Sequence, residues 1–402
     1  MKLLVTLMLI GTSLSSYAET KSFIKEFSGK LRSHHNYRQY EVSNAMHGEF
    51  ASALMVGGEL SILTNTYYGL SGKATLASSD YVINNPRDKD GLYQFLFGEE
   101  NIAVRSESYL TYTRNKLKIE SGRKKINTPF ANGSDAFIIP ITYEGLFSQY
   151  KMEHLNLQLM RINKIKARNT SSFTSVADYA LARLNQTTTE TDYNNETTII
   201  GFNYKNAGLK TNIWHYNYSD LFTTTYLDAD YSHNKVNYAV QIGQQSDNGE
   251  ALIGDIDSKL AGLKLSYKAS NKLNISLGHN KVDTNEDSFK GGAWITPYTI
   301  FTDTIFTNSM LSGMGNMAPG SASKLMLLYG LTEKTDIRLS YSQLVFAEYN
   351  SVDQVTQDEV DFWITSKLPM NGLSVTNRFA RLDSTNDGQS VFAWRSQLQY
   401  VF

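Results

Sequence analysis

Apolar and polar residues alternate along many short segments of this chain, and this alternation restricts the fold more than any other feature. Every second residue is apolar in the segments LKLSYK (263–268), LNISLG (273–278) and IRLSYS (337–342). A period of two gives each strand one apolar face and one polar face. Two architectures produce such strands. In a soluble sandwich or propeller the apolar faces meet in a core, whereas in a membrane barrel they face lipid and the polar faces line a wet lumen.

Three further features favour the barrel. The polar faces carry many charges, and the chain ends in an alternating strand whose last residue, Phe402, is aromatic. A terminal Phe on such a strand resembles the signal read by the barrel-insertion machinery, which is therefore an expected partner. Aromatic residues also gather near predicted strand ends, as the interfacial girdles of membrane barrels do: Tyr67, Tyr68, Tyr216, Tyr218, Tyr400 and Phe402.

Length and charge fit one large barrel. The chain has 402 residues without a Pro/Gly/Ser-rich linker, and its 38 basic and 39 acidic residues nearly cancel, which excludes a nucleic-acid partner. A membrane strand takes ~9–11 residues and its connections about as many again, so roughly 16–18 strands are expected. The predicted fold class is therefore all-β, a transmembrane antiparallel β-barrel of that size.

The N-terminus predicts export. Lys2 precedes the apolar run from Leu3 to Ile10, and small residues stand at Ser16 and Ala18. This order is typical of a signal peptide over residues 1–18, which leaves residues 19–402 as the barrel. The apolar run is shorter than the ~20 residues that a membrane-spanning helix needs. The expected location is the outer membrane of a Gram-negative bacterium, where lipid and lipopolysaccharide would surround the barrel.

The stretch from Gly122 to Gly145 does not have the pattern of a strand. Its prolines and its Asn-Gly pair favour turns, and its apolar residues Phe137, Ile138 and Ile139 can pack against a surface. We interpret it as a constriction loop that folds into the lumen. Its candidate functional residues are Arg123, Lys124, Asn132, Asp135, Tyr143 and Glu144. Longer polar segments at 169–196, 283–293 and 297–322 are predicted to be loops at the opposite end from the short turns, and the last is a candidate to cover the mouth.

Several segments resemble the OprD family of outer-membrane porins. They are Gly57-Gly58-Glu59-Leu60 with residues 67–73, Gly122-Arg123 with Thr128-Pro129, and Pro140-Ile141-Thr142-Tyr143-Glu144-Gly145, which is similar to the inward third-loop motif of that family. The resemblance is clearest over about the first 160 residues and again near Trp294 to Tyr298. It implies eighteen strands, a narrow pore lined by a ladder of basic side chains, and diffusion of small hydrophilic solutes, often carboxylates or amino acids.

Strand parity identifies candidate rungs of such a ladder. The inward positions that we expect to be basic are Arg32, Arg38, Arg105, Lys118, Arg338, Arg378 and Arg395. Arginine stays charged at any working pH and presents a planar fork to carboxylates. A row of arginines would attract an anion and pass it between neighbouring sites. The alternative is that these side chains solvate the wall or pair with Glu107, Glu120 and Asp361.

Other functional classes leave no motif in the sequence. It lacks the Gly-x-Ser-x-Gly, His-Glu-x-x-His and phosphate-loop patterns of enzymes, so neither an enzyme activity nor a cofactor is expected. His34 and His35 could ligate a metal ion by residue type, but adjacent strand residues point to opposite faces, so no metal site is expected there. A plugged surface barrel, acting as an adhesin or an outer-membrane enzyme, is the alternative function. Homotrimer and monomer stay equally open.

Overall fold

The structure, a computed structural model, describes residues 23–41, 50–84, 98–99, 101–134, 136–186, 196–299, 301–348, 353–385 and 388–402. The predicted signal peptide, residues 1–18, lies outside these ranges. Among the described residues, no helix has the length and apolarity needed to cross a membrane.

Strands make up most of the described chain. They are β1 (Ile24–Glu41), β2 (Phe50–Thr64), β3 (Leu70–Asn84), β4 (Ile102–Arg114), β5 (Leu117–Lys124), β6 (Thr142–Lys151), β7 (Leu155–Lys166), β8 (Thr174–Ser175), β9 (Thr197–Asn206), β10 (Leu209–Tyr218), β11 (Phe222–His233), β12 (Val236–Asp247), β13 (Asp257–Lys268), β14 (Leu273–Val282), β15 (Gly320–Gly330), β16 (Thr335–Phe346), β17 (Val355–Lys367), β18 (Leu373–Ser384) and β19 (Ser390–Val401). A helix, α3 (Val176–Arg183), and a short 3-10 turn, η2 (Phe289–Gly291), lie in two of the connections.

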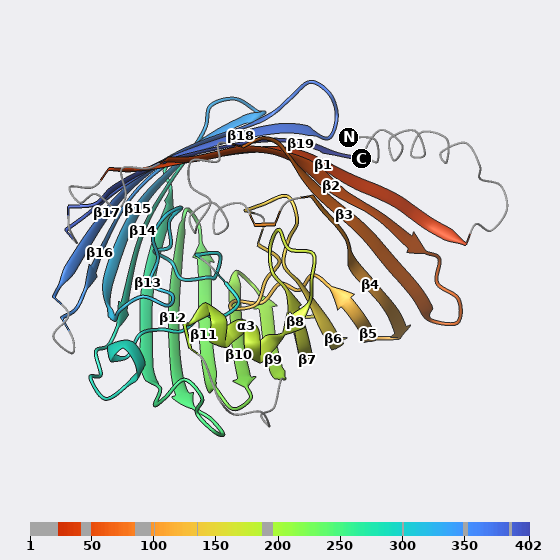
Figure 1. Cartoon of the computed structure of the whole chain (residues 1–402), viewed down its shortest axis with the longest axis horizontal. Coiled ribbons are helices and arrows are strands. Elements are labelled where there is room, and N and C mark those ends of the chain that lie inside the picture. The colour runs from red at the N-terminus through yellow and green to blue at the C-terminus, as the bar shows by residue number, and fades with distance from the viewer. Residues whose placement is uncertain are drawn as a thin grey trace.

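The strands form one closed antiparallel barrel. Each wall strand pairs with the next along the chain, and β1 pairs with both β2 and β19, which closes the ring. The two-residue β8 pairs with β7, while β7 continues directly to β9, so within the described ranges eighteen strands form the wall. Figure 1 shows these strands following one another in chain order around the ring. The fold class and the upper limit of the expected strand number are confirmed.

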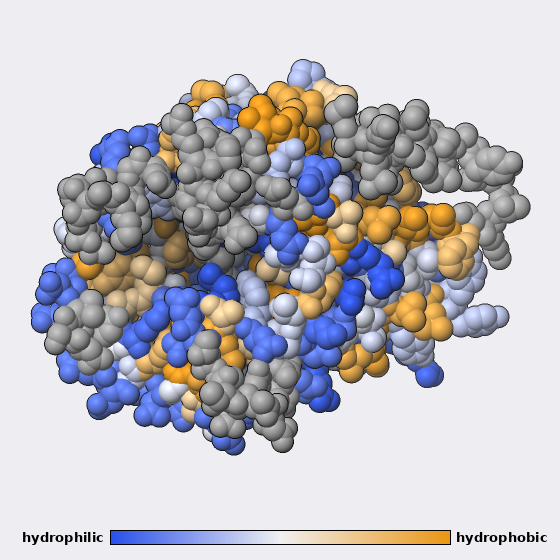
Figure 2. Space-filling model, viewed as in Figure 1, coloured by the Kyte–Doolittle hydropathy of each residue, from blue (hydrophilic) through white to orange (hydrophobic). Residues whose placement is uncertain are grey.

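Large apolar side chains cover the outer face, as the alternation predicts. Leu110, Leu159, Leu263 and Leu277 are each more than half exposed, which is the pattern of a wall that faces lipid. Figure 2 shows hydrophobic side chains gathered on the outer surface at the right, over β2 to β4. Exposed large apolar residues alternate with inward polar residues on most strands.

Exposed tyrosines ring the end of the barrel that carries the short turns. They stand one to three residues from the turns, as an interfacial girdle does: Tyr112, Tyr150, Tyr231, Tyr238, Tyr267 and Tyr329. Tyr216 and Tyr218 were expected in such a girdle, and that expectation was wrong. Both side chains are fully buried at the other end of β10, where they point into the lumen and stack on each other with ring centroids 5.9 Å apart.

Loops fill much of the barrel interior on the side of β7 to β15. Trp294, Tyr298 and Met314 of the connection from β14 to β15 are buried together with α3 residues such as Leu181. The predicted loop at 297–322 therefore packs inside the mouth, and its last three residues already belong to β15. Helix α3 was not predicted. Its N-cap is Ser175, whose hydroxyl accepts from the backbone N–H of Asp178, and this Ser-x-x-Asp spacing is the signal that could have found it.

Glycine permits close contact between strands near the closing seam. A Cβ added at Gly58 would lie 2.1 Å from the backbone oxygen of Lys30 on β1, and one at Gly57 would lie 2.0 Å from that of Ser78 on β3. Backbone atoms cannot move aside without a shift of the whole strand. The Gly57-Gly58 pair therefore lets β1, β2 and β3 approach closely.

Replacing Gly58 by Ala should lower the free energy of unfolding by about 1–3 kcal/mol, because the added methyl group overpacks against a backbone carbonyl. Urea titration of the folded band in unheated gel samples measures this loss. Gly72→Ala is the matched control, since its nearest neighbour would be a flexible Leu110 methyl group at 3.4 Å. Equal midpoints for the two variants would contradict this account of the seam.

Candidate functional site

A loop of residues 125–141 enters the lumen between β5 and β6. The predicted loop was longer, and its two ends prove to be strand. Gly122 pairs with Gly145, Arg123 with Glu144 and Lys124 with Tyr143, so these residues extend β5 and β6. The basic residue Arg123 and the acidic residue Glu144 are register partners on adjacent strands. The local sequence around either residue does not show this pairing.

One end of the loop packs on the inner wall of β2 to β4. Phe137, Ile138 and Ile139 are buried against Ala51, Ala53 and Met55. The backbone N–H of Ile139 donates to the Asn169 side-chain oxygen at 3.1 Å, and its carbonyl accepts from the Asn169 N–H at 3.2 Å. The loop is therefore fastened to the connection that follows β7.

The other end of the loop packs on the opposite side of the lumen. The Phe130 ring lies 5.0 Å from that of Tyr226 and 5.6 Å from that of Trp294. Asn132 donates from its side-chain amide to the Thr302 carbonyl at 2.9 Å, and the buried Tyr143 hydroxyl reaches the Asn132 carbonyl at 3.4 Å. The loop thus crosses the interior and narrows it, as predicted (Figure 1).

Lysines and glutamates hold the base of this loop. Lys125 lies 3.0 Å from a Glu59 oxygen and 3.7 Å from a Glu107 oxygen, and its backbone N–H donates to Glu107 at 3.1 Å. Both carboxylates are almost fully buried. Burial alone would lower the pKa of Lys125, but the charges of Glu59 and Glu107 raise it above its ordinary value. Lys125 therefore stays charged in the folded protein.

A second ion-pair cluster lies beside it. Lys118 approaches Glu120 at 2.7 Å, and Lys124 pairs with the other oxygen of the same carboxylate. Two glutamates that could have neutralised the predicted arginines, Glu107 and Glu120, are thus paired with lysines. Of the predicted basic residues, Lys118 belongs to this cluster and lies apart from the arginines.

Arginines occupy the opposite wall in one continuous row. Arg338, Trp363, Arg378 and Arg395 are successive register partners on β16, β17, β18 and β19, and Arg395 pairs with Asn36 of β1. The guanidinium carbons of Arg338 and Arg378 lie 4.2 and 4.3 Å from the centroid of the Trp363 ring. Trp363 therefore sits between two cations and fixes their planes by cation–π stacking. Trp363 was not among the predicted pore residues, although its alternation with Phe362 and Ile364 places it inward.

The apolar part of the loop meets this row. Arg32 donates to the Phe137 carbonyl at 2.6 Å, and the guanidinium carbons of Arg395 and Arg168 lie 5.6 and 4.3 Å from the Phe137 ring centroid. The ring of His34 stacks on the same phenyl group at 5.6 Å. Arg168 follows β7, and no pattern near it marked it for this role. Phe137 is thus the point at which the constriction loop touches the basic wall.

Acidic residues on β17 are partly committed to the other lumen loop. Glu359 accepts from the Leu311 N–H at 2.8 Å and from the Ser312 hydroxyl at 2.5 Å. Asp361 accepts from the Ser340 hydroxyl at 3.1 Å and lies 4.0 Å from the Lys324 ammonium. Arg38, the remaining predicted rung on β1, is inward and donates to the Tyr40 hydroxyl at 3.3 Å.

Arg105, Arg123 and Glu144 are not in the lumen, which corrects the prediction. Thr75 pairs with Glu107 but Leu76 pairs with Arg105, so Ser106 is an extra residue, a β-bulge. The bulge reverses the parity of β4 and turns Arg105 outward beside the exposed Leu76. Arg123 pairs in register with Ser108 and Glu144 on the same outer face, and forms an ion pair with Glu144 at 2.6 Å. Asp135, another predicted residue, lies outside the described residues.

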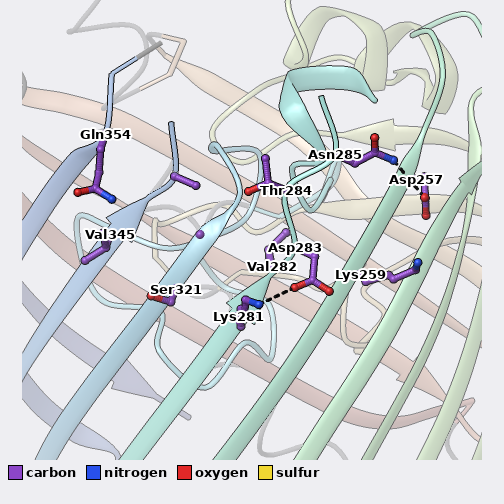
Figure 3. A pocket seen from close by; sticks show the side chains of 12 residues that line it. Asp257, Lys259, Lys281, Val282, Asp283, Thr284, Asn285, Ser321, Val345 and Gln354 are labelled. Atoms are coloured by element: carbon purple, nitrogen blue, oxygen red, sulfur yellow. Dashed lines mark hydrogen bonds and ion pairs between the residues drawn. The ribbon is translucent and has the colours of Figure 1, made fainter. Parts of the chain in front are cut away.

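A groove of about 730 Å³ lies on the outer wall at the loop end of β13 to β17. Figure 3 shows Lys281 and Asp283 pointing toward each other, and Asn285 toward Asp257. These contacts measure 3.0 and 3.1 Å. The groove faces away from the lumen and its lysines and aspartates balance, so it is not part of the constriction. In the described part of the chain, no group of three or more His, Cys, Asp or Glu residues could hold a metal ion.

Comparison with known proteins agrees with this architecture. The family model for outer membrane porin, OprD family, matches residues 83–310, which is more than half of the chain. No curated protein matches the sequence.

Solved structures match over nearly the whole chain. The structure of OccK9 (OpdG) of Pseudomonas aeruginosa superposes with a TM-score of 0.76 at 15% identity, covering 95% of this chain and 99% of that one. OpdK of the same organism, solved with vanillate, gives a TM-score of 0.73 at 14% identity, covering 95% and 100%. OccAB4 of Acinetobacter baumannii gives 0.74 at 12% identity, covering 94% and 98%. At these identities, the likeness shows the shared fold.

Replacing Lys125 by Met should loosen the loop base and lower the free energy of unfolding by about 1–2 kcal/mol, because two buried carboxylates lose a partner while Lys125 itself is partly exposed. The raised pKa of Lys125 determines how its contribution to the free energy of unfolding changes with pH. Its stabilisation is complete below the ordinary lysine pKa of about 10.4 and is lost as pH rises through the folded value.

The difference between wild type and the Met variant should therefore persist from neutral pH to about pH 9 and close only at more alkaline pH. Urea titrations across this range measure it. Lys118→Met is the control, since Lys118 contacts a single carboxylate, that of Glu120, whereas Lys125 lies between Glu59 and Glu107 and joins the loop to both. A difference that disappears near neutral pH would contradict the role given to Lys125.

Proposed function

This chain belongs to the OprD family of outer-membrane porins, and from that premise we propose that its pore favours small carboxylate-bearing solutes. As a member of that family it lies in the outer membrane of a Gram-negative bacterium. The observation that carries the proposal is the arginine row on the wall that the loop meets at Phe137. Arg338, Arg378 and Arg395 lie on adjacent strands of this wall, and Arg395 is the one that Phe137 approaches.

The charge balance of the lumen supports an anion path. The glutamates of β2, β4 and β5 are paired with lysines at the loop base. Among the described residues, neither Arg338 nor Arg395 forms an ion pair with a carboxylate within 4.0 Å. A positive wall in a narrow, low-dielectric passage raises the local anion concentration.

The stacking of Arg338 and Arg378 on Trp363 supports passage rather than tight capture. The aromatic ring holds the two guanidinium groups in register on neighbouring strands, where a carboxylate would pass from one to the next. Successive weak sites let an ion enter and leave. The structure of OpdK with vanillate, a carboxylate, is consistent with this choice of solute class.

Removing the charges of the arginine row should shift the ion preference of the pore towards cations. In the triple variant Arg338→Gln, Arg378→Gln, Arg395→Gln we expect the anion-to-cation permeability ratio to fall several-fold, because the fixed charges that attract anions are gone. The measurement is the reversal potential of purified protein in a planar bilayer under a salt gradient.

The control for this experiment is Arg381→Gln. Arg381 is exposed on the outer face of β18 and pairs with Asp383 at 3.2 Å, so it should leave the reversal potential unchanged. An unchanged ratio in the triple variant would refute the arginine path. Folded wild-type protein without conductance steps would instead favour the plugged-barrel alternative.

Shortening Phe137 to Ala should raise single-channel conductance. The variant removes the ring that touches Arg395 and Arg168 while the backbone carbonyl that accepts from Arg32 remains, so the loop keeps its position and the passage widens. Ile138→Ala is the control. Ile138 shares the buried cluster of Phe137 on β2 to β4, whereas the contacts with Arg32, Arg168 and Arg395 belong to Phe137, so the Ile138 variant should lower stability more than it alters conductance. Equal conductance of Phe137→Ala and wild type would place the narrowest point elsewhere.

A further inference from the structure

Three arginines and two glutamates surround a cavity on the outer face of the barrel. The cavity has a volume of about 620 Å³ and lies at the loop end of β4 to β7. Its charged lining residues are Arg105, Arg123, Arg161, Glu144 and Glu196. We propose that this cavity binds a phosphate group of a lipopolysaccharide molecule in the outer leaflet.

Two β-bulges lie at this cavity, and one of them turns Arg105 toward the membrane. The extra residue Ser106 turns Arg105 outward on β4. On β7, Glu144 pairs with Lys164 but Gly145 pairs with Ile162, so Asn163 is the extra residue, and it leaves both Asn163 and Lys164 exposed outside. Bulges of this kind re-aim side chains at functional places. Here they gather positive charge on a wall that otherwise faces lipid.

The two ion pairs of the cavity involve two of its three arginines and do not include Arg105. Arg123 pairs with Glu144 at 2.6 Å, and the Arg161 Nε donates to Glu196 at 2.6 Å. The Arg123 guanidinium also stacks on Phe173 at 4.2 Å, which fixes its plane. Within the described ranges, Arg105 has neither an ion pair nor a hydrogen bond. An arginine on the lipid face of a barrel costs little free energy near the interface, and an anion bound in the cavity would give Arg105 a partner.

The surroundings of the cavity favour a lipid over a free anion. Leu146 forms part of the lining, and Leu76 and Leu110, both more than half exposed, lie beside it on β3 and β4. Arg161 pairs in register with Leu146, so basic and apolar groups adjoin at the same level of the wall. A phosphorylated lipid can satisfy both, since its phosphate meets the planar guanidinium fork and its acyl chains cover the leucines. Inorganic phosphate can satisfy only the arginines.

The other groove at this end of the barrel lacks the excess charge. Lys281 is neutralised by Asp283, and Asn285 donates to Asp257 (Figure 3). Lys259 also lines the groove. Its lysines and aspartates are equal in number, so it offers an anion no net attraction. This contrast assigns the lipid phosphate to the cavity on β4 to β7.

The test compares lipid A with its dephosphorylated form. Delipidated, refolded protein in detergent is titrated with each lipid, and binding is followed by native mass spectrometry. We expect wild type to bind the phosphorylated lipid at least about tenfold more tightly than the dephosphorylated one, and the double variant Arg105→Gln, Arg161→Gln to lose that preference. Inorganic phosphate should not compete at the lipid concentrations used.

The matched control is Arg381→Gln, which removes an equally exposed outer arginine that Asp383 already neutralises and should keep the wild-type preference. Equal affinity of wild type for the two lipids, or an unchanged preference in the double variant, would overturn the proposal. Competition by inorganic phosphate would assign the cavity to free anions instead. Should the double variant fail to refold, Arg105→Gln alone decides the question, because no described ion pair or hydrogen bond depends on Arg105. Conductance plays no part in this test, so its result is independent of the pore proposal.

Discussion

Hydrocarbon offers no hydrogen bonds, and this single constraint organises the molecule. Every backbone amide of the wall must find its partner within the protein, which only a ring without edges allows. The pairing of β1 with β19 provides that closure, and the last residue takes part in it, since Gly29 and Phe402 exchange backbone hydrogen bonds at 2.9 and 3.0 Å. Closure then leaves an interior that side chains of the wall cannot fill, so loops enter it and define the passage.

The loops are held by polar contacts on one side and apolar contacts on the other. Lys125 with its two glutamates fixes the base of the first loop, and Phe130 and Phe137 fix its two flanks on opposite walls. The lysine–glutamate clusters and the arginine row thus occupy different parts of the circumference. This separation keeps the carboxylates of β2, β4 and β5 close to the lysines, while Glu359 and Asp361 on β17 bond to the second lumen loop and to Ser340.

Local pattern in the sequence was sufficient for the barrel and for part of the site. The period of two placed Arg32, Arg38, Arg338, Arg378 and Arg395 on the inner face, because their strands run without interruption. It failed for Arg105, because one extra residue shifts the parity of β4 and nothing in the local sequence marks the bulge.

Contacts between distant segments were also beyond reach. Arg32 and Phe137 are 105 positions apart, and only the closed ring brings them together. The ends of the constriction loop were misjudged for the same reason, since Arg123 and Glu144 become strand residues only by pairing with each other.

The bulge at Ser106 has a consequence for how such barrels can diverge. With it, Ile102 and Val104 face the loop's apolar residues while Arg105 faces the membrane. Deletion of Ser106 would reverse which side chains of the first residues of β4 point inward. Ile102 would then face lipid and Arg105 would face the channel. A deletion of one residue can therefore change the charge of a pore without any substitution. Near the end of a strand, such a deletion leaves the pairing of the remaining residues unchanged.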